Sequence, residues 1–139
     1  MRARIRAHLL YVQVLKGVIT VVRNRLSELP EEIDSLKSLV LLDCSNNEIE
    51  TLPPEIKKLT NLCSLILSSN RLQSVPNEVF CLTMIQTLRL SNNIIEVLPV
   101  LVGNLVHLRE LLVDGNQIRS LPLELGTQFT CFTGMKVKY

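Results

Sequence analysis

A spacing of 23 residues recurs through most of this 139-residue chain and limits the possible folds more than any other feature. Asparagine occupies one position of the period, and proline occupies another. Asn24, Asn47, Asn70, Asn93 and Asn116 form the first column, and Pro30, Pro53, Pro76, Pro99 and Pro122 form the second. A fixed spacing held over so many units indicates a repeat architecture.

Apolar residues keep the same register around these two columns. Leu65 and Leu67 lie two positions apart, with the polar residues Ser64 and Ser68 beside them. This alternation predicts a short strand that is buried on one face. Because one unit cannot bury its leucines alone, the units must stack, with their strands pairing in parallel about 4.8 Å apart. The pattern therefore predicts a right-handed coil of chain with a parallel sheet along one side.

The asparagine and proline columns both have structural interpretations. An amide side chain can donate and accept hydrogen bonds, so it can satisfy backbone groups where the chain leaves a strand. We expect the five asparagines to form an internal ladder. Proline has a fixed φ and no N–H, and the x-x-I-x-x-L spacing that follows it predicts a helical or 3₁₀ turn.

The complete pattern, L-x-x-L-x-L-x-x-N-x-L-x-x-L-P-x-x-I-x-x-L, resembles the leucine-rich repeat over roughly residues 17–125. The L-P-x-x-I segment in a 23-residue unit is most similar to the intracellular Ras-suppressor and scribble-like group. The resemblance implies an α/β solenoid with a parallel sheet on its concave side and short helical or 3₁₀ turns on its convex side. It also implies signalling scaffolds and small-GTPase regulation as the functional setting.

Three segments are predicted along the chain: a basic N-terminal cap over residues 1–16, the repeats over residues 17–125, and a partial repeat over residues 126–139. In the first segment, Ile5, Leu9 and Val12 have helical spacing, which favours an amphipathic helix that covers the first repeat. A secretory signal and a mitochondrial transit peptide are alternatives for this arginine-rich start.

The repeat register breaks near the C-terminus. A shift of one residue returns apolar side chains to the leucine columns, which predicts a last strand at the C-terminal edge, ending near Val137 after a one-residue insertion. The shifted residues are Phe129, Phe132, Met135 and Val137. The abrupt stop at Tyr139 favours an alternative in which the chain is a fragment of a larger protein with a catalytic or effector domain.

Charge and composition argue against several kinds of partner. The net charge of +2 combines an acid-free, basic start with acidic repeats, since residues 26–135 hold 7 basic and 13 acidic side chains. This balance, with only 4% aromatic residues, argues against nucleic acid as the partner of the repeats. No apolar run reaches 18 residues, so no transmembrane segment is predicted.

No catalytic or metal-binding motif is found in the sequence. Phosphate-binding and nucleophile-elbow motifs are missing, so we predict no enzyme activity and no cofactor. The acidic pairs Glu31–Glu32 and Glu48–Glu50 are interpreted as solvated carboxylates. The four cysteines are scattered, which favours a reducing compartment and a cytoplasmic location over a disulfide-capped extracellular receptor. With two histidines and no C-x-x-C pair, a zinc site has no ligand set.

The outward side of the strands is the candidate binding site, because its positions belong to no structural column. A mixture of apolar and charged residues there, with Arg89 as an anchor, resembles a protein interface. In the alternative interpretation, the charges only pair with each other across strands. The predicted protein-binding residues are Leu41, Asp43, Ser64, Ile66, Thr87, Arg89, Glu110, Leu112 and Asp114.

Overall fold

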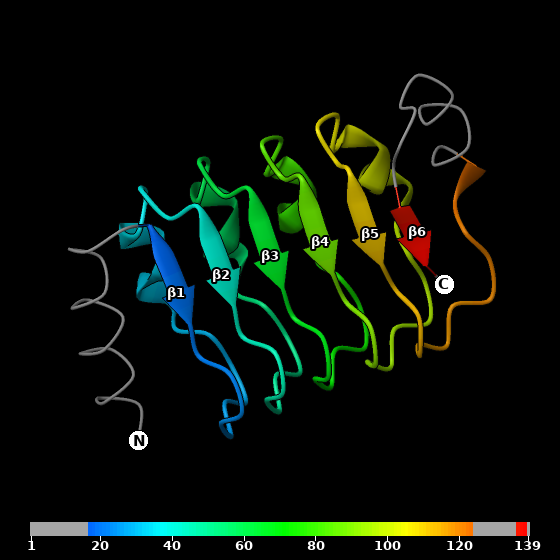
Figure 1. Cartoon of the computed structure of the whole chain (residues 1–139), viewed down its shortest axis with the longest axis horizontal. Coiled ribbons are helices and arrows are strands. Elements are labelled where there is room, and N and C mark those ends of the chain that lie inside the picture. The colour runs from blue at the N-terminus through cyan, green and yellow to red at the C-terminus, as the bar shows by residue number, and fades with distance from the viewer. Residues whose placement is uncertain (1–16, 124–135, 139) are drawn as a thin grey trace.

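The computed structural model describes residues 17–123 and 136–138, and these residues form a single stack of repeats (Figure 1). Strands and 3₁₀ helices alternate along the chain, and each strand lies beside the next one in sequence. The strands are β1 (Val18–Thr20), β2 (Leu41–Asp43), β3 (Ser64–Ile66), β4 (Thr87–Arg89), β5 (Glu110–Leu112) and β6 (Lys136–Lys138). The 3₁₀ helices are η1 (Glu31–Ser35), η2 (Pro54–Lys58), η3 (Asn77–Cys81) and η4 (Val100–Asn104).

The sheet is parallel, and its register follows the 23-residue period from β1 to β5. Leu42 pairs with Leu65, Leu65 with Leu88, and Leu88 with Leu111, so one column of the sequence becomes one row of the sheet. The predicted parallel sheet and the predicted strand positions are confirmed.

The register of the last strand differs from the prediction. Val137 pairs with Leu111 and lies 26 residues after it, so three extra residues separate β5 from β6 instead of one. The prediction had placed Met135 opposite Leu111, because it chose the smallest shift that restored an apolar pattern. Phe129, Phe132 and Met135 lie outside the described residues, as does the predicted N-terminal helix.

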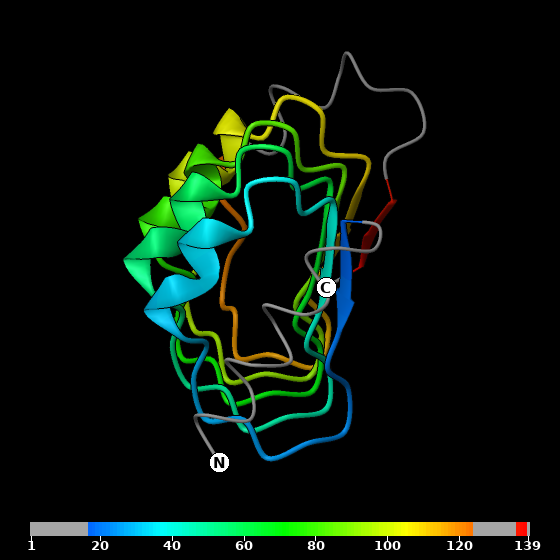
Figure 2. The same cartoon turned by 90° about the vertical axis from the view of Figure 1, so that its left-hand side faces the viewer.

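Each 3₁₀ helix begins directly after a proline of the repeat. Pro30, Pro53, Pro76 and Pro99 have φ between −63° and −70°, which is the range that the proline ring imposes. The first turn closes when a backbone N–H, such as that of Ile33, donates to the proline carbonyl. Figure 2 shows these helices on the opposite side of the stack from the sheet. The predicted short turns are confirmed as 3₁₀ helices.

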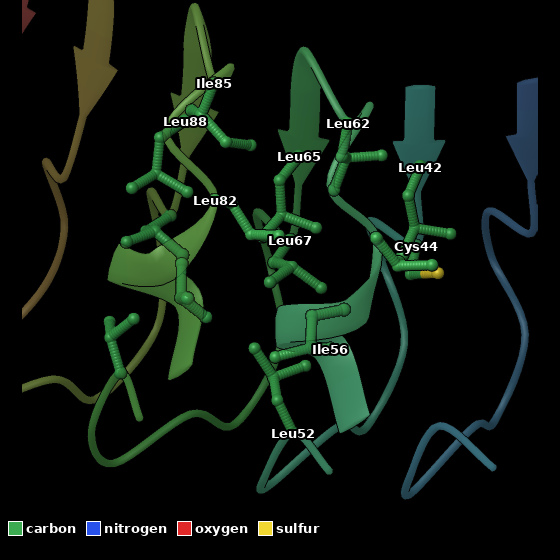
Figure 3. Close-up of a cluster of buried hydrophobic side chains, with 14 of the residues drawn as sticks. Leu42, Cys44, Leu52, Ile56, Leu62, Leu65, Leu67, Leu82, Ile85 and Leu88 are labelled. Carbon is green, nitrogen blue, oxygen red and sulfur yellow. The ribbon is translucent and has the colours of Figure 1, made fainter. Parts of the chain in front are cut away.

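The core fills the space between the sheet and the 3₁₀ helices. Leu42 and Leu65 point inward from the strands, Leu67 points inward directly after β3, Ile56 points inward from η2, and all four are fully buried (Figure 3). Burying one such side chain contributes about 1.5 to 3 kcal/mol, and one continuous cluster runs from the first described repeat to the last complete one. The stack therefore has a single shared core.

Asparagine side chains connect neighbouring repeats at the ends of the strands. Asn70 Oδ1 accepts from the backbone N–H of Ile49, and its Nδ2 donates to the carbonyls of Cys44 and Leu67. The same bonds recur at Asn47, Asn93 and Asn116. The predicted ladder is therefore present.

Asn24 differs from the other asparagines of its column. It is exposed, and its Nδ2 donates to the carbonyl of Val22, two residues before it. The carbonyl that Asn47 reaches in the preceding repeat lies 26 residues before it. Among the described residues the ladder therefore has four members, and Asn24, the predicted fifth, does not make these bonds there.

The residue before each asparagine of the column has a left-handed backbone. Arg23, Asn46, Ser69 and Asn92 have φ of 57° or 58°, and Gly115 has φ of 68°. Asparagine and glycine tolerate this region well, whereas arginine and serine adopt it less readily. The sequence signal for this turn is the occurrence of Asn or Gly in the column, at Asn46, Asn92 and Gly115.

Candidate functional site

The open sheet face, defined here as the side of the sheet turned away from the 3₁₀ helices, carries all the predicted site residues (Figure 2). In β2 to β5 the central residue of each strand is buried and its two neighbours are partly exposed, so the predicted alternation is confirmed. The face has three rows that run across the strands. They are Val18, Leu41, Ser64, Thr87 and Glu110; then Thr20, Asp43, Ile66, Arg89, Leu112 and Lys138; then Ser45, Ser68, Ser91 and Asp114.

Arg89 and Glu110 form an ion pair across β4 and β5. Arg89 Nη2 lies 3.2 Å from Glu110 Oε2, and the two side chains are 43% and 24% exposed. Arg89 Nε is buried and has no hydrogen-bond partner among the residues that the structure describes. Because Glu110 already neutralises the guanidinium, a partner that used Arg89 as an anchor would have to compete with this pair.

Asp114 is engaged by two groups on neighbouring strands. Ser91 Oγ donates to Asp114 Oδ1 over 2.6 Å, and Lys138 Nζ lies 3.1 Å from Asp114 Oδ2. The hydrogen bond from Ser91, followed by that from Lys138, holds the pKa of Asp114 below its usual value. The interpretation in which charges pair across strands therefore accounts for Arg89, Glu110 and Asp114.

The half of the open sheet face on β1 to β3 has a different character. Its side chains are apolar or small, and Leu41, Ser64 and Ile66 are all partly exposed. Asp43 is the exception. Asp43 Oδ1 accepts from the backbone N–H of Ser45 over 3.0 Å and from Ser45 Oγ over 2.7 Å.

The acidic pairs of the sequence lie away from the open sheet face. Glu31 and Glu32 are exposed in η1, and Glu50 is exposed in the turn after Ile49. Glu48 was interpreted as a solvated carboxylate, but its Oε2 lies 3.1 Å from Arg71 Nη2 in the next repeat. A similar bond joins Lys58 to Asp34, so these charges connect neighbouring repeats.

The described cysteines are unpaired thiols in three different environments. Cys44 is buried in the core, Cys63 is partly exposed and Cys81 is exposed. Burial, with a smaller contribution from the charge of Asp43, raises the pKa of Cys44 to about 12. Cys44 is therefore a neutral core residue, as predicted from its column. Over residues 17–123 and 136–138, no three His, Cys, Asp or Glu side chains gather as a metal site would require.

Family models for the leucine-rich repeat match the central part of the chain. One matches residues 60–118 and a second matches residues 38–59, so together they cover more than half of the sequence. The chain belongs to the leucine-rich repeat family. No curated protein sequence matches it at a significant level.

Solved structures of leucine-rich repeat proteins share the fold of this member. A leucine-rich repeat protein of Leptospira interrogans is 33% identical with a TM-score of 0.76, over 87% of this chain and 30% of that one. The ectodomain of the receptor kinase GASSHO1/SCHENGEN3 of Arabidopsis thaliana was solved with CASPARIAN STRIP INTEGRITY FACTOR 2. It is 29% identical with a TM-score of 0.71, and the match covers 81% of this chain and 14% of the ectodomain chain. The plant peptide hormone receptor RGFR1, solved with RGF2, is 32% identical with a TM-score of 0.71. This match covers 80% of this chain and 19% of the receptor chain.

The chain thus spans less than a third of the length of each of these proteins. In the described part of this leucine-rich repeat protein, no helix has the length and apolar character needed to cross a membrane.

Proposed function

We propose that this leucine-rich repeat protein is a non-enzymatic protein-binding module that contacts its partner with the open sheet face. The observation that carries the proposal is the contrast between the two sides of each strand. Inward positions repeat the same apolar type, whereas the outward positions within β2 to β5 change from repeat to repeat and are partly exposed. Side chains that the core does not require are free to serve recognition.

Similar structures support this use of the fold. The two plant receptors were solved in complex with CASPARIAN STRIP INTEGRITY FACTOR 2 and RGF2, and a third solved structure is the BIR3–SERK2 complex of Arabidopsis thaliana. The partners in those complexes are specific to those proteins. For this chain, the complexes support a protein or a peptide as the class of partner and do not identify it.

The test uses two variants that place the same new charge on different surfaces. Ile66→Asp changes the centre of the open sheet face, and Val97→Asp changes an exposed residue, 68% accessible, that lies outside the strands. Proteins captured from an extract of the source cells by the parent chain and by each variant are compared by quantitative mass spectrometry. We expect proteins that the parent and Val97→Asp both retain and that Ile66→Asp loses. If Ile66→Asp captures everything that the parent captures, the open sheet face is not the binding site.

The setting that we propose is intracellular signalling, in the cytoplasm, with a small GTPase or another signalling protein as the class of partner. This rests on the similarity to the Ras-suppressor and scribble-like group and on the scattered cysteines. Mass spectrometry of thiols in protein isolated from cells tests the compartment. Free thiols are expected, and oxidised cysteines in secreted protein would favour an extracellular receptor.

An alternative is that these repeats belong to a larger protein with a catalytic or effector domain. The short share of the matched structures that the chain spans supports this possibility. Sequencing of the complete transcripts decides between the two. A stop codon after Tyr139 in every transcript favours a free-standing module, and a continuing reading frame favours the larger protein.

A further inference from the structure

Asp43 stands apart from the other described carboxylates of the open sheet face. Glu110 has Arg89 as its cation, and Asp114 has Lys138. Within residues 17–123 and 136–138, the structure gives Asp43 no cationic partner, and both of its hydrogen bonds come from Ser45 and use Oδ1. Among the described residues, Asp43 therefore has no opposite charge beside it, whereas Glu110 and Asp114 each have a cation.

The surroundings of Asp43 are uncharged. In its row across the sheet, the neighbours are Thr20 on β1 and Ile66 on β3. Along its own strand, the next outward residues are Leu41 and Ser45. Ile66 and Leu41 are partly exposed, so two of the neighbours of Asp43 on this face are accessible aliphatic side chains. A charge bordered by apolar surface is more strongly paired on binding, because contact excludes water from it.

Ser45 also holds the carboxylate in one place. The backbone N–H and the hydroxyl of Ser45 donate to the same Oδ1, over 3.0 Å and 2.7 Å. A group that is already oriented loses little freedom when a partner binds it. The wider charge of the repeats acts in the same direction, because residues 26–135 hold 13 acidic and 7 basic side chains. Such an excess attracts a cationic group over longer distances.

We propose that the partner presents an arginine or lysine that pairs with Asp43 and is flanked by apolar side chains that contact Leu41 and Ile66. This inference rests on the proposed function and specifies its chemistry. It moves the expected anchor from Arg89, which Glu110 already pairs, to a carboxylate on the opposite half of the face. The site is assigned to a protein or peptide partner, because the adjoining aliphatic residues need apolar contacts as well as a charge.

The probe for this site is a library of random peptides displayed on phage and selected on the intact chain. We expect the selected peptides to be enriched in Arg or Lys next to aliphatic or aromatic residues. The charge-reversed variant Asp43→Lys, selected in the same way, should instead enrich peptides with Asp or Glu. Peptides without this basic preference, or the same preference with Asp43→Lys, would overturn the inference.

The affinity of one selected peptide is then measured against matched variants. Asp43→Asn keeps an oxygen to accept from Ser45, so it removes the charge without removing the hydrogen bonds. It should weaken binding at least about tenfold, with an effect that shrinks as salt rises. Glu50→Gln removes an exposed carboxylate that lies outside the strands and should leave the affinity unchanged.

Other outcomes separate this inference from the proposed function. A peptide that Ile66→Asp weakens and Asp43→Asn does not would overturn the basic anchor but keep the open sheet face as the binding site. A peptide that neither variant affects binds elsewhere and counts against both. If no peptide is enriched above an uncoated surface, the inference fails, while the capture of whole proteins still tests the function.

Discussion

The inner and outer sides of the same parallel sheet follow different rules. Leu42, Leu65, Leu88 and Leu111 form one inner row, and all four are fully buried. One position earlier, the outer row reads Leu41, Ser64, Thr87 and Glu110. The backbone and the register are the same in both rows, so the difference comes only from what the side chains face.

An inner side chain packs against the same position in the repeats before and after it. A change of size or polarity there is therefore felt by two neighbours, and the residue type is restricted to one that fits the stack. An outer side chain faces solvent or a partner. Periodic positions of this chain therefore build the fold, and the positions of the open sheet face that vary between repeats are the ones available for recognition.

The strongest test of this contrast truncates adjacent residues on opposite sides of β3. Leu65→Ala removes a fully buried side chain and should lower the free energy of unfolding by about 2 to 5 kcal/mol. Ile66→Ala, on the open sheet face, should lower it by less than about 1 kcal/mol. Urea denaturation of both variants measures the two values. Equal losses would mean that the two sides do not differ in their structural role.

The asparagine ladder offers the next largest effect. Asn70→Ala leaves the N–H of Ile49 and the carbonyls of Cys44 and Leu67 without their side-chain partner, and should cost roughly 2 to 4 kcal/mol. Asn24→Ala is the matched control, because Asn24 is exposed, and should cost less than about 0.5 kcal/mol. Thermal or chemical unfolding of both variants measures the two losses of unfolding free energy. A large loss at Asn24 would show that the first repeat depends on its asparagine as the inner repeats do.

Cys44 makes the inner side sensitive to alkaline pH. Its folded pKa of about 12 lies above the ordinary thiol value of 9.0, so the folded state holds the proton more tightly than the unfolded chain. This contribution to stability is complete below about pH 9 and decreases as the pH rises toward 12. Between pH 9 and pH 10 the loss should be about 1 kcal/mol.

The variant Cys44→Val separates the contribution of the Cys44 thiol from that of other groups that titrate in the same pH range. Valine is a suitable replacement because Val113 already occupies the same column. Urea unfolding at the two pH values should show a smaller decrease for Cys44→Val than for the parent. Equal decreases would mean that the thiol does not couple folding to pH.

The ion pairs between repeats should have the smallest effect. Arg71 and Glu48 lie 3.1 Å apart, but their side chains are 58% and 39% exposed, so water and salt screen the pair. Arg71→Gln should change the free energy of unfolding by no more than about 1 kcal/mol, and by less at high salt. Unfolding in low and high salt measures this. A larger, salt-independent loss would place these surface charges among the elements that hold the stack together.

Much of the fold could be predicted from the sequence, because the 23-residue repeat determines which residues become neighbours. The 23-residue spacing specified the parallel register from β1 to β5, and the position of each proline specified the start of a 3₁₀ helix. The two-residue alternation around Leu65 separated buried from outward residues. Each of these features depends on contacts between a residue and its counterparts one repeat away. In a periodic sequence those counterparts can be identified directly from the spacing.

The sequence by itself thus determined the stack, its core and the residues that line the open sheet face. Only the tertiary structure decided the register of Val137, the position of Asn24 outside the ladder, and the pairing of Arg89 with Glu110. An interrupted period no longer specifies which residues become neighbours, and a long charged side chain can reach several partners. Because those choices depend on side-chain geometry across adjacent strands, only the structure shows that, among the described residues, Glu110 and Asp114 have cationic partners and Asp43 does not.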